Sequence, residues 1–171
     1  MNSAWIRAIL ILPGNVLVTI PELLLYFTGY QWPEENRLPW LIAGGVLFAA
    51  GLALAIWTMR LFAVLGKGTA APWDPPKRLV VAGPYRHVRN PMITSVLTML
   101  VGEFLILSST VIAIWFGVFL LIQILYFPLV EEKELERRFG DDYVEYRKNV
   151  PRWIPRISAW IPAEASEKQQ E

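Results

Sequence analysis

The chain has 171 residues, of which 54% are hydrophobic and 18% are charged, and its formal net charge is +1. A soluble domain of this length could not bury so much apolar surface, so the composition predicts an integral membrane protein. Cysteine is absent, which excludes disulfides, thiol catalysis and thiolate metal sites, and nothing in the charge pattern resembles a nucleic-acid-binding surface.

Four apolar runs are long enough, or nearly so, to cross a hydrocarbon core, which needs about 20 residues. They cover residues 5–27, 40–62, 92–107 and 110–130. Pro13 and Pro21 in the first run predict a kink there. Only Ser108 and Ser109 separate the third run from the fourth, so these two predict a tight antiparallel helical hairpin. The predicted fold class is all-α, a polytopic membrane protein with about four transmembrane helices.

Basic residues indicate the orientation of these helices. Lysines and arginines gather between the second and third runs and again after the fourth. By the positive-inside rule both segments are cytoplasmic. The segment between the first two runs carries only Arg37 against Glu34 and Glu35, and the serine turn is uncharged. Four spans then place the N-terminus and the C-terminus in the cytoplasm.

The cytoplasmic parts are expected to differ in structure. Residues 66–76 are rich in glycine and proline and predict an ordered loop. Residues 131–139 predict a helix with acids in its first turn and arginines in its last. Gly140 would end it, and Asp141 or Asp142 would cap a second short helix that reaches Val150. Residues 163–171 read as a disordered tail, which leaves residues 1–162 as one membrane-embedded domain.

The densest polar stretch, residues 83–91, leads into the third apolar run. Arg86 and Arg89 are three residues apart and would project from one side of a helical turn, where they could bind a carboxylate or a phosphate. The same pattern is expected of two arginines that bind no ligand and only extend their side chains to lipid headgroups. His87 could serve as a hydrogen-bonding residue of the loop or as a base. Asn90 and Pro91 fit a helix N-cap and the first helical position.

Three acids are further candidates. Glu131 and Glu132 are adjacent, hence about 100° apart on a helix, and cannot both face one pocket. We expect one to bind a ligand while the other pairs with Arg86 or Arg89, although acids at a helix start need no function. Glu103 lies within an apolar run, where an ionisable group is a functional candidate by default. Its alternative role is a hydrogen-bonded carboxyl that holds helices together.

Taken in order, these segments resemble the isoprenylcysteine carboxyl methyltransferase and phospholipid methyltransferase family over residues 66–156. The resemblance rests on residues 83–86 and 89–92, Gly102-Glu103, Glu131-Glu132, residues 139–146 and residues 150–152. Many members have histidine in place of Asn90 and tyrosine in place of Ile93. The resemblance implies a compact member of the bacterial inner membrane that binds S-adenosylmethionine at the cytoplasmic face. The matching cofactor-binding residues are Arg89, Asn90, Pro91, Glu131 and Glu132.

Such an enzyme would transfer a methyl group to a lipophilic acceptor that enters from the membrane, either an isoprenylcysteine-like carboxylate or a lipid amine. The reaction needs alignment and exclusion of water, and no metal. Arg86 or Arg89 would hold the carboxylate of the cofactor, and His87 or Glu103 would take the proton of an amine. One alternative is an isoprenoid- or sterol-type NADPH reductase, which the acidic pair disfavours. The other is a membrane scaffold whose charges only set topology.

Overall fold

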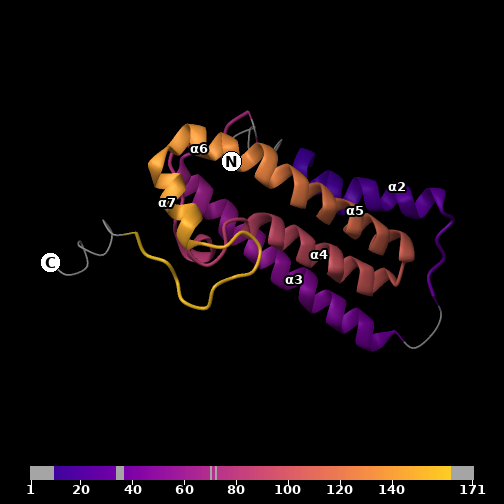
Figure 1. The fold of residues 1–171 in the computed structure, drawn as a ribbon. Helices are drawn as coiled ribbons and strands as arrows, with labels where there is room; N and C mark the ends of the chain where they lie inside the picture. Colours follow the sequence, from indigo (N-terminus) through magenta and orange to yellow (C-terminus); the bar gives the residue numbers. More distant parts are fainter. Residues whose placement is uncertain (1–9, 34–36, 70, 72, 163–171) are drawn as a thin grey trace.

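The structure, a computed structural model, describes residues 10–33, 37–69, 71 and 73–162. The predictions for the start of the first run, for Glu34 and Glu35 and for the tail fall outside these residues. Every regular element within them is a helix, which confirms the all-α class (Figure 1). In chain order they are η1 (Leu10–Thr19), α2 (Ile20–Phe27), α3 (Leu38–Leu61), η2 (Phe62–Gly66), η3 (Gly83–Arg86), α4 (Pro91–Leu107), α5 (Thr110–Tyr126), η4 (Phe127–Glu131), α6 (Glu132–Phe139) and α7 (Asp141–Asn149).

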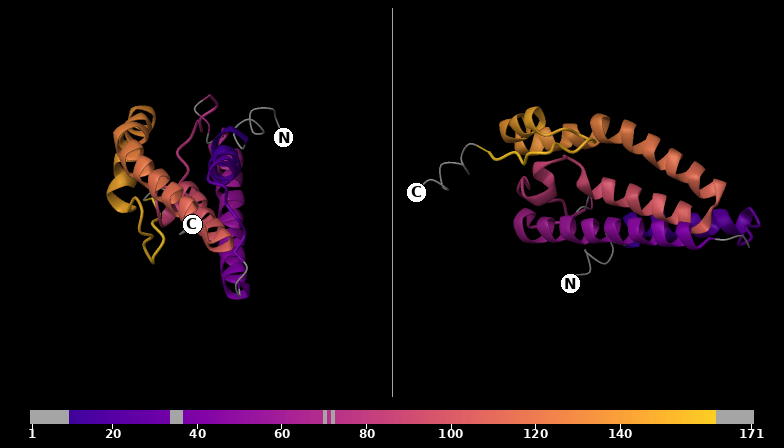
Figure 2. Two further views of the ribbon diagram at one scale, coloured as in Figure 1. Left: turned by 90° about the vertical axis from the view of Figure 1, so that its right-hand side faces the viewer. Right: turned by 90° about the horizontal axis from the view of Figure 1, so that it is seen from below.

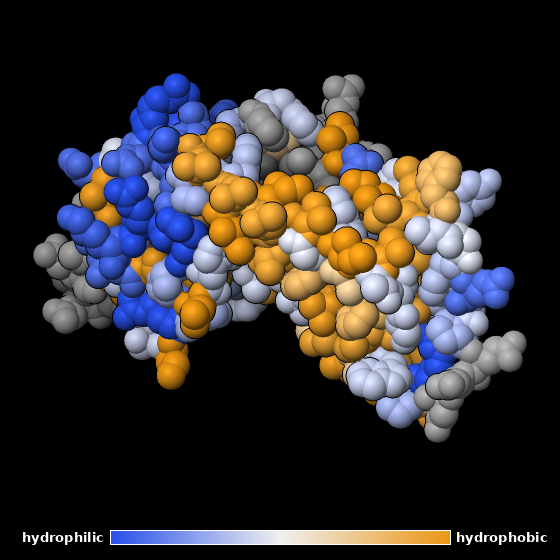
Figure 3. Space-filling view, turned by 45° about the vertical axis from the view of Figure 1, so that its right-hand side comes forward, coloured by the Kyte–Doolittle hydropathy of each residue, from blue (hydrophilic) through white to orange (hydrophobic). Residues whose placement is uncertain are grey.

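Two helices are long and apolar enough to cross a membrane. They are Leu38–Gly66 and Thr110–Phe139, and two shorter apolar helices cover Pro13–Phe27 and Pro91–Leu107. At 17 residues α4 is about 26 Å long, slightly less than a hydrocarbon core of about 30 Å. Figure 3 shows hydrophobic side chains over the body of the molecule and hydrophilic ones gathered at the end that carries α6 and α7. This division is what a membrane protein with a polar cap requires.

The first apolar run, whose prolines predict a kink, changes from one type of helix to another. Residues Leu10–Thr19 form a π-helix with Pro13 inside it, and an α-helix follows from Ile20. Pro21 lies in the first turn of α2, where its missing N–H would have no helical partner in any case. The irregularity is therefore a change of helix type.

Helix α4 packs closely along α3 through glycines. A Cβ atom placed on Gly44 would lie 2.6 Å from the backbone oxygen of Gly102, and one on Gly51 would lie 2.8 Å from that of Ser95. Small residues at such a contact let two helix backbones approach. The short serine turn predicts α5 as the partner of α4, and no pattern in the sequence predicts this second pairing with α3.

The turn between α4 and α5 consists of the two serines, as predicted. Ser108 adopts a left-handed conformation with φ of 48°, and its N–H donates to the backbone oxygen of Phe104 at 2.7 Å. From this turn the two helices diverge toward the end that carries α6, as both Figure 1 and Figure 2 show. The hairpin is thus closed at the serine turn and open at its other end, which corrects the expectation of a tight pair.

The C-terminal segment returns to the polar stretch before α4. A π-helical turn, η4, carries α5 into α6, and Gly140 with φ of 55° ends α6 as predicted. Gly140 is also the N-cap of α7, and no side chain caps that helix, so the expected capping by Asp141 or Asp142 is wrong. Beyond α7, the irregular segment that follows is joined to the polar stretch by three backbone hydrogen bonds of 2.9–3.0 Å. The Arg89 N–H donates to the backbone oxygen of Pro151, the Arg156 N–H to that of His87 and the Trp160 N–H to that of Arg86.

Candidate functional site

A cavity of about 750 Å³ lies where α4 and α5 diverge. Side chains of α3, α4, α5 and α6 line it, together with the loop before η3 and two tyrosines of α7. One part of its wall is apolar, with Ala55, Met59, Val96, Met99 and Phe119. The polar part includes Tyr85, Arg89, Asn90, Glu131 and Tyr143. The cavity therefore offers charged and hydrogen-bonding groups next to a hydrophobic compartment.

The polar stretch before α4 forms a wall with two faces. Tyr85, Arg89 and Asn90 line the large cavity, whereas Arg86 and His87 line a second, smaller hollow. The 3₁₀-helix η3 ends at Arg86, so the two arginines do not belong to one helical turn. The prediction that Arg86 and Arg89 project from the same side is wrong.

Arg89 belongs to a buried ion-pair cluster. Its Nη1 lies 3.0 Å from Oε1 of Glu132, and the two side chains are only 7% and 5% exposed. Glu132 also accepts two hydrogen bonds from Arg152, which follows α7 and Pro151. Two cations thus neutralise one buried carboxylate, as a buried charge requires.

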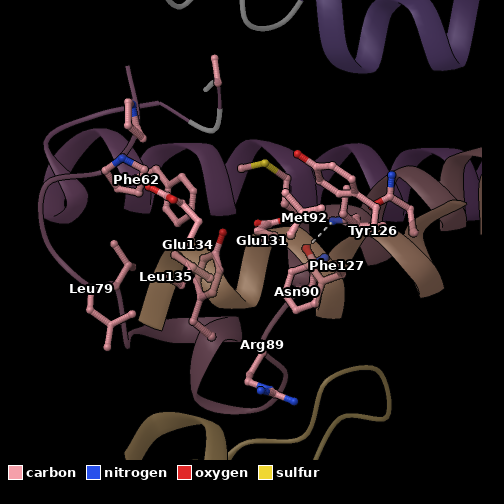
Figure 4. A pocket seen from close by; sticks show the side chains of 18 of the residues that line it. Phe62, Leu79, Arg89, Asn90, Met92, Tyr126, Phe127, Glu131, Glu134 and Leu135 are labelled. Carbon is pink, nitrogen blue, oxygen red and sulfur yellow. Dashed lines mark hydrogen bonds between the residues drawn. The ribbon is translucent and has the colours of Figure 1, made fainter. Parts of the chain in front are cut away.

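The two adjacent glutamates point to different surroundings, as their helical spacing predicts. Glu132 is 4% exposed and serves the ion-pair cluster. Glu131 lines the cavity instead. Figure 4 shows its side chain in the same space as Met92 and Tyr126, which come from α4 and α5. Within the described residues it forms no hydrogen bond or ion pair with another side chain, which leaves its carboxyl group to the cavity.

Four cavity-lining residues carry buried polar atoms without a hydrogen-bond partner in the described part of the chain. These atoms are Tyr85 Oη, Arg89 Nε, Asn90 Nδ2 and Tyr143 Oη. Each such atom costs about 1–3 kcal/mol when left unpaired, and native proteins leave few of them. Burial raises the pKa of Tyr143 to about 12, so its hydroxyl stays protonated near neutral pH. Their concentration around one cavity indicates a polar ligand there.

Asn90 and Pro91 take the structural positions that the sequence indicates. The Asn90 side-chain oxygen accepts a hydrogen bond from the Ile93 N–H at 3.3 Å, and Pro91 is the first residue of α4. Capping uses only the oxygen of the Asn90 amide, so its nitrogen remains for a ligand in the large cavity. Pro91 lines the smaller hollow and not the large cavity.

Neither proposed base lines the large cavity. His87 lines the smaller hollow, and its Nδ1 donates to the backbone oxygen of Arg156 at 2.8 Å. Glu103 lies 13 residues beyond Asn90 on the same helical path, about 20 Å along the axis, and one of its carboxyl oxygens is buried without a partner in the described part. The geometry does not support the expected role of either residue as a base.

Three residues of this site are not predicted from the sequence, namely Tyr85, Tyr143 and Arg152. Tyr85 and Tyr143 lay inside the quoted family segments, but a tyrosine beside an apolar run also suits packing. Arg152 lies twenty residues after Glu132, and no local spacing pattern links the two. For Tyr143 a signal did exist in the sequence, because it precedes Tyr146 by about one turn of the predicted helix and so lies on the same face.

Comparison with known proteins gives one match. The family model described as phospholipid methyltransferase matches residues 39–142, more than half of the chain. No curated protein and no solved structure matches the chain. The matched residues include α3, both helices of the hairpin and α6, and hence most of the cavity wall.

Proposed function

The chain belongs to the phospholipid methyltransferase family, and on this basis we propose that it methylates the amine headgroup of a membrane phospholipid. Members of the family are membrane enzymes that use S-adenosylmethionine as methyl donor. Membership decides between the functions considered above, so the reductase and the scaffold are both set aside. The acceptor and the roles of individual residues belong to the proposal.

The proposed arrangement in the membrane has four crossings, two by the long helices and two by the shorter apolar ones. The end that carries α6 and α7 faces the cytoplasm, as do both termini, and the membrane is a bacterial inner membrane. The apolar helices support the crossings. The orientation is supported by the distribution of arginine and lysine, which are concentrated in the loop before η3 and from α6 onward.

The polar part of the cavity fits the methyl donor. When bound, S-adenosylmethionine supplies a methyl group on a positively charged sulfonium, together with a carboxylate, an amino group and hydroxyl groups. Arg89 and Asn90 offer unpartnered N–H donors for a carboxylate. The Tyr85 and Tyr143 hydroxyls offer further hydrogen bonds for its amino and hydroxyl groups. The chain therefore supplies a complementary group for each polar class of the donor.

The apolar part of the cavity suits the chains of a lipid. Exposed hydrophobic residues border it on the α5 side, including Tyr126, Leu129 and Val130. A phospholipid that enters where α4 and α5 diverge would keep its acyl chains in the membrane and place its headgroup among the polar residues. The acyl chains of the lipid would then not have to pass through the polar end of the protein.

The observation that carries the choice of acceptor is Glu131, an acid in the cavity wall that no described side chain neutralises. An ammonium headgroup is attracted to this carboxylate, whereas an isoprenylcysteine carboxylate is repelled by it. Glu131 can take one proton from the ammonium nitrogen, whose lone pair would then form the new bond to the methyl carbon. The carbon–sulfur bond of the donor would break in the same step, and its electron pair would stay on the sulfur as a neutral thioether. The hydrophobic wall excludes water, which strengthens both interactions.

The proposal is tested with membranes that contain the protein and methyl-labelled S-adenosylmethionine. Label should appear in extracted amine phospholipids and not in prenylcysteine analogues. Glu131→Gln should lower the rate at least about 100-fold. Glu136→Gln is the matched control, since it makes the same change on α6 at a residue whose exposed carboxylate pairs with Arg147, and it should stay within about twofold.

Two results would contradict the proposal. One is label that enters prenylcysteine analogues in preference to phospholipids. The other is a Glu131→Gln protein that methylates phospholipids as fast as the Glu136→Gln control.

A further inference from the structure

The smaller hollow, of about 480 Å³, lies on the opposite face of the polar stretch from the large cavity. Leu54 and Trp57 of α3 form one side, and Pro91 and Thr94 at the start of α4 form another. Arg86 and His87 contribute its charged and polar groups, while Pro155 and Ala159 of the C-terminal segment complete the wall. None of the side chains that bind the proposed methyl donor takes part.

This hollow runs from polar to apolar surroundings along the helix axes. Leu54 lies seven residues, about 10 Å, before the end of α3 at Leu61. Trp57 lies one turn nearer that end and is 53% exposed. Arg86 and His87 lie in the segment before α4 begins. Along the hollow, a charged group is followed by an exposed tryptophan and then by aliphatic residues. This spatial order matches the layers of a membrane from the headgroups into the hydrocarbon core.

The charge in the hollow has one sign. Arg86 uses its Nε for a hydrogen bond to the backbone oxygen of Val81 at 3.3 Å. Its two terminal nitrogens make no hydrogen bond or ion pair to the described residues, and no acidic residue lines the hollow. A guanidinium with free donors matches a phosphate group. A choline or ammonium group would find no acid here.

The wall of the hollow is held in place before any ligand binds. Gly83 has φ of +53° and packs on Trp57, because a Cβ atom at this position would lie 3.0 Å from the indole ring. The C-terminal segment is tied across the hollow by backbone hydrogen bonds from Arg156 to His87 and from Trp160 to Arg86, each 3.0 Å. Preorganisation of this kind lowers the cost of binding.

We propose that this hollow binds an anionic phospholipid, with the phosphate on Arg86 and an acyl chain along Trp57 and Leu54. The site is separate from the cavity in which methyl transfer is proposed. It shares with that proposal only the membrane orientation, so failure of methyl transfer would leave it standing. The bound lipid would anchor the segment that presents Tyr85 and Arg89 to the large cavity.

Native mass spectrometry of the purified protein tests the preference for anionic lipid. The protein is offered phosphatidylglycerol and phosphatidylcholine in equal amounts, and it should retain the former about fivefold over the latter. Arg86→Gln should abolish the preference. Arg60→Gln is the matched control, because Arg60 is exposed near the end of α3 and does not line the hollow, and it should keep the preference. Equal preference in the Arg86→Gln and Arg60→Gln proteins overturns the proposal.

A second measurement does not depend on the Arg86 variant. Phosphatidylglycerol with brominated acyl chains should quench tryptophan fluorescence more in the unaltered protein than in Trp57→Phe. Brominated phosphatidylcholine at the same concentration should show a smaller difference. If the two lipids quench Trp57 equally, the hollow does not select an anionic lipid and the proposal is wrong.

Discussion

The Glu132 carboxylate accepts hydrogen bonds from both Nε and Nη2 of Arg152, at 2.7 and 2.8 Å. This forked pair joins the start of α6 to the segment after α7. The same carboxylate lies 3.0 Å from Arg89, beside the large cavity. A residue near the C-terminal end of the described chain therefore fixes the position of a residue at the start of the hairpin.

Replacement of Arg152 should disturb the site from a distance. In Arg152→Gln, Glu132 keeps only Arg89 as a cation, and Arg89 is drawn toward it. We expect the free energy of unfolding to fall by about 1–3 kcal/mol, below the value for a fully buried pair because Arg152 is one-third exposed. The KM for S-adenosylmethionine should rise more than kcat falls. Thermal unfolding in detergent and steady-state kinetics measure the two effects.

Arg147→Gln provides the control for that change. It removes the 2.8 Å ion pair with Glu136, in which both side chains are about 40% exposed, and exposed pairs contribute about 0–1 kcal/mol. Arg152→Lys should keep the positive charge but lose the paired hydrogen bonds to Glu132. Its KM for S-adenosylmethionine should lie between that of the unaltered protein and that of Arg152→Gln. Equal effects of Arg152→Gln and Arg147→Gln would show that the buried cluster does not position Arg89.

Tyr143 and Tyr146 should respond differently to the same substitution. The Tyr146 hydroxyl donates to the backbone oxygen of Tyr85 at 2.7 Å, so Tyr146→Phe should lower the free energy of unfolding by about 1–2 kcal/mol. The Tyr143 hydroxyl lies near the Arg89 guanidinium, which acts against the effect of burial on its pKa, but it makes no hydrogen bond of normal length to the described residues. Tyr143→Phe should therefore leave the free energy of unfolding unchanged or raise it by up to about 1–3 kcal/mol, and it should weaken binding of S-adenosylmethionine by about tenfold, as measured by calorimetry. Unchanged binding would remove Tyr143 from the donor site.

Alkaline pH should destabilise the protein through these same tyrosines. Burial raises the pKa of Tyr143 to about 12, and it raises those of Tyr85 and Tyr146 as well. Above about pH 10 the unfolded chain loses tyrosine protons that the folded protein retains, so the free energy of unfolding falls as pH rises. The unfolding temperature between about pH 9 and 11 should drop less steeply in Tyr143→Phe. If the unfolding temperature falls equally steeply with pH in the two proteins, the buried Tyr143 hydroxyl is not a source of the pH dependence.

Two adjacent glycines of α3 should differ in their tolerance of alanine. A methyl group at Gly44 would meet the backbone oxygen of Gly102 at 2.6 Å, whereas one at Gly45 has no neighbour within 4 Å. Gly44→Ala should lower the free energy of unfolding by about 1–3 kcal/mol by pushing α4 away. Gly45→Ala should be neutral or stabilising, because alanine favours the helix. Thermal unfolding of the two variants, side by side, tests the α3–α4 contact.

The sequence predicted the elements of this molecule better than their contacts. The serine turn, the end of α6 at Gly140 and the cap at Asn90 follow from local rules on turns and helix ends, and the structure contains all three. The partner of α4 could not be predicted in this way. Gly44 and Gly102 are 58 residues apart, and a glycine within an apolar run indicates close packing without naming the other helix.

The site was predicted in part for the same reason. Helical spacing alone separates Glu131 from Glu132, and the structure shows that separation. Arg86 and Arg89 were assigned to one side because three-residue spacing suits a helix, but η3 ends between them. Arg152 and the hollow around Arg86 depend on where the chain returns after α7, which is decided by long-range contacts that no local pattern encodes.

The two-residue turn at Ser108 and Ser109 sets how the large cavity can change its width. Helix α4 is packed against α3, and α5 is joined to the first apolar run by the Trp115 side-chain N–H, which donates to the backbone oxygen of Val16 at 3.0 Å. A change in the width of the cavity would therefore move α5 together with that run about the serine turn. A small rotation at this turn displaces the far end of the 17-residue helix α5, about 26 Å long, by roughly half an ångström for each degree. A widening of the cavity at the end that carries α6 would therefore leave the end at the serine turn almost in place.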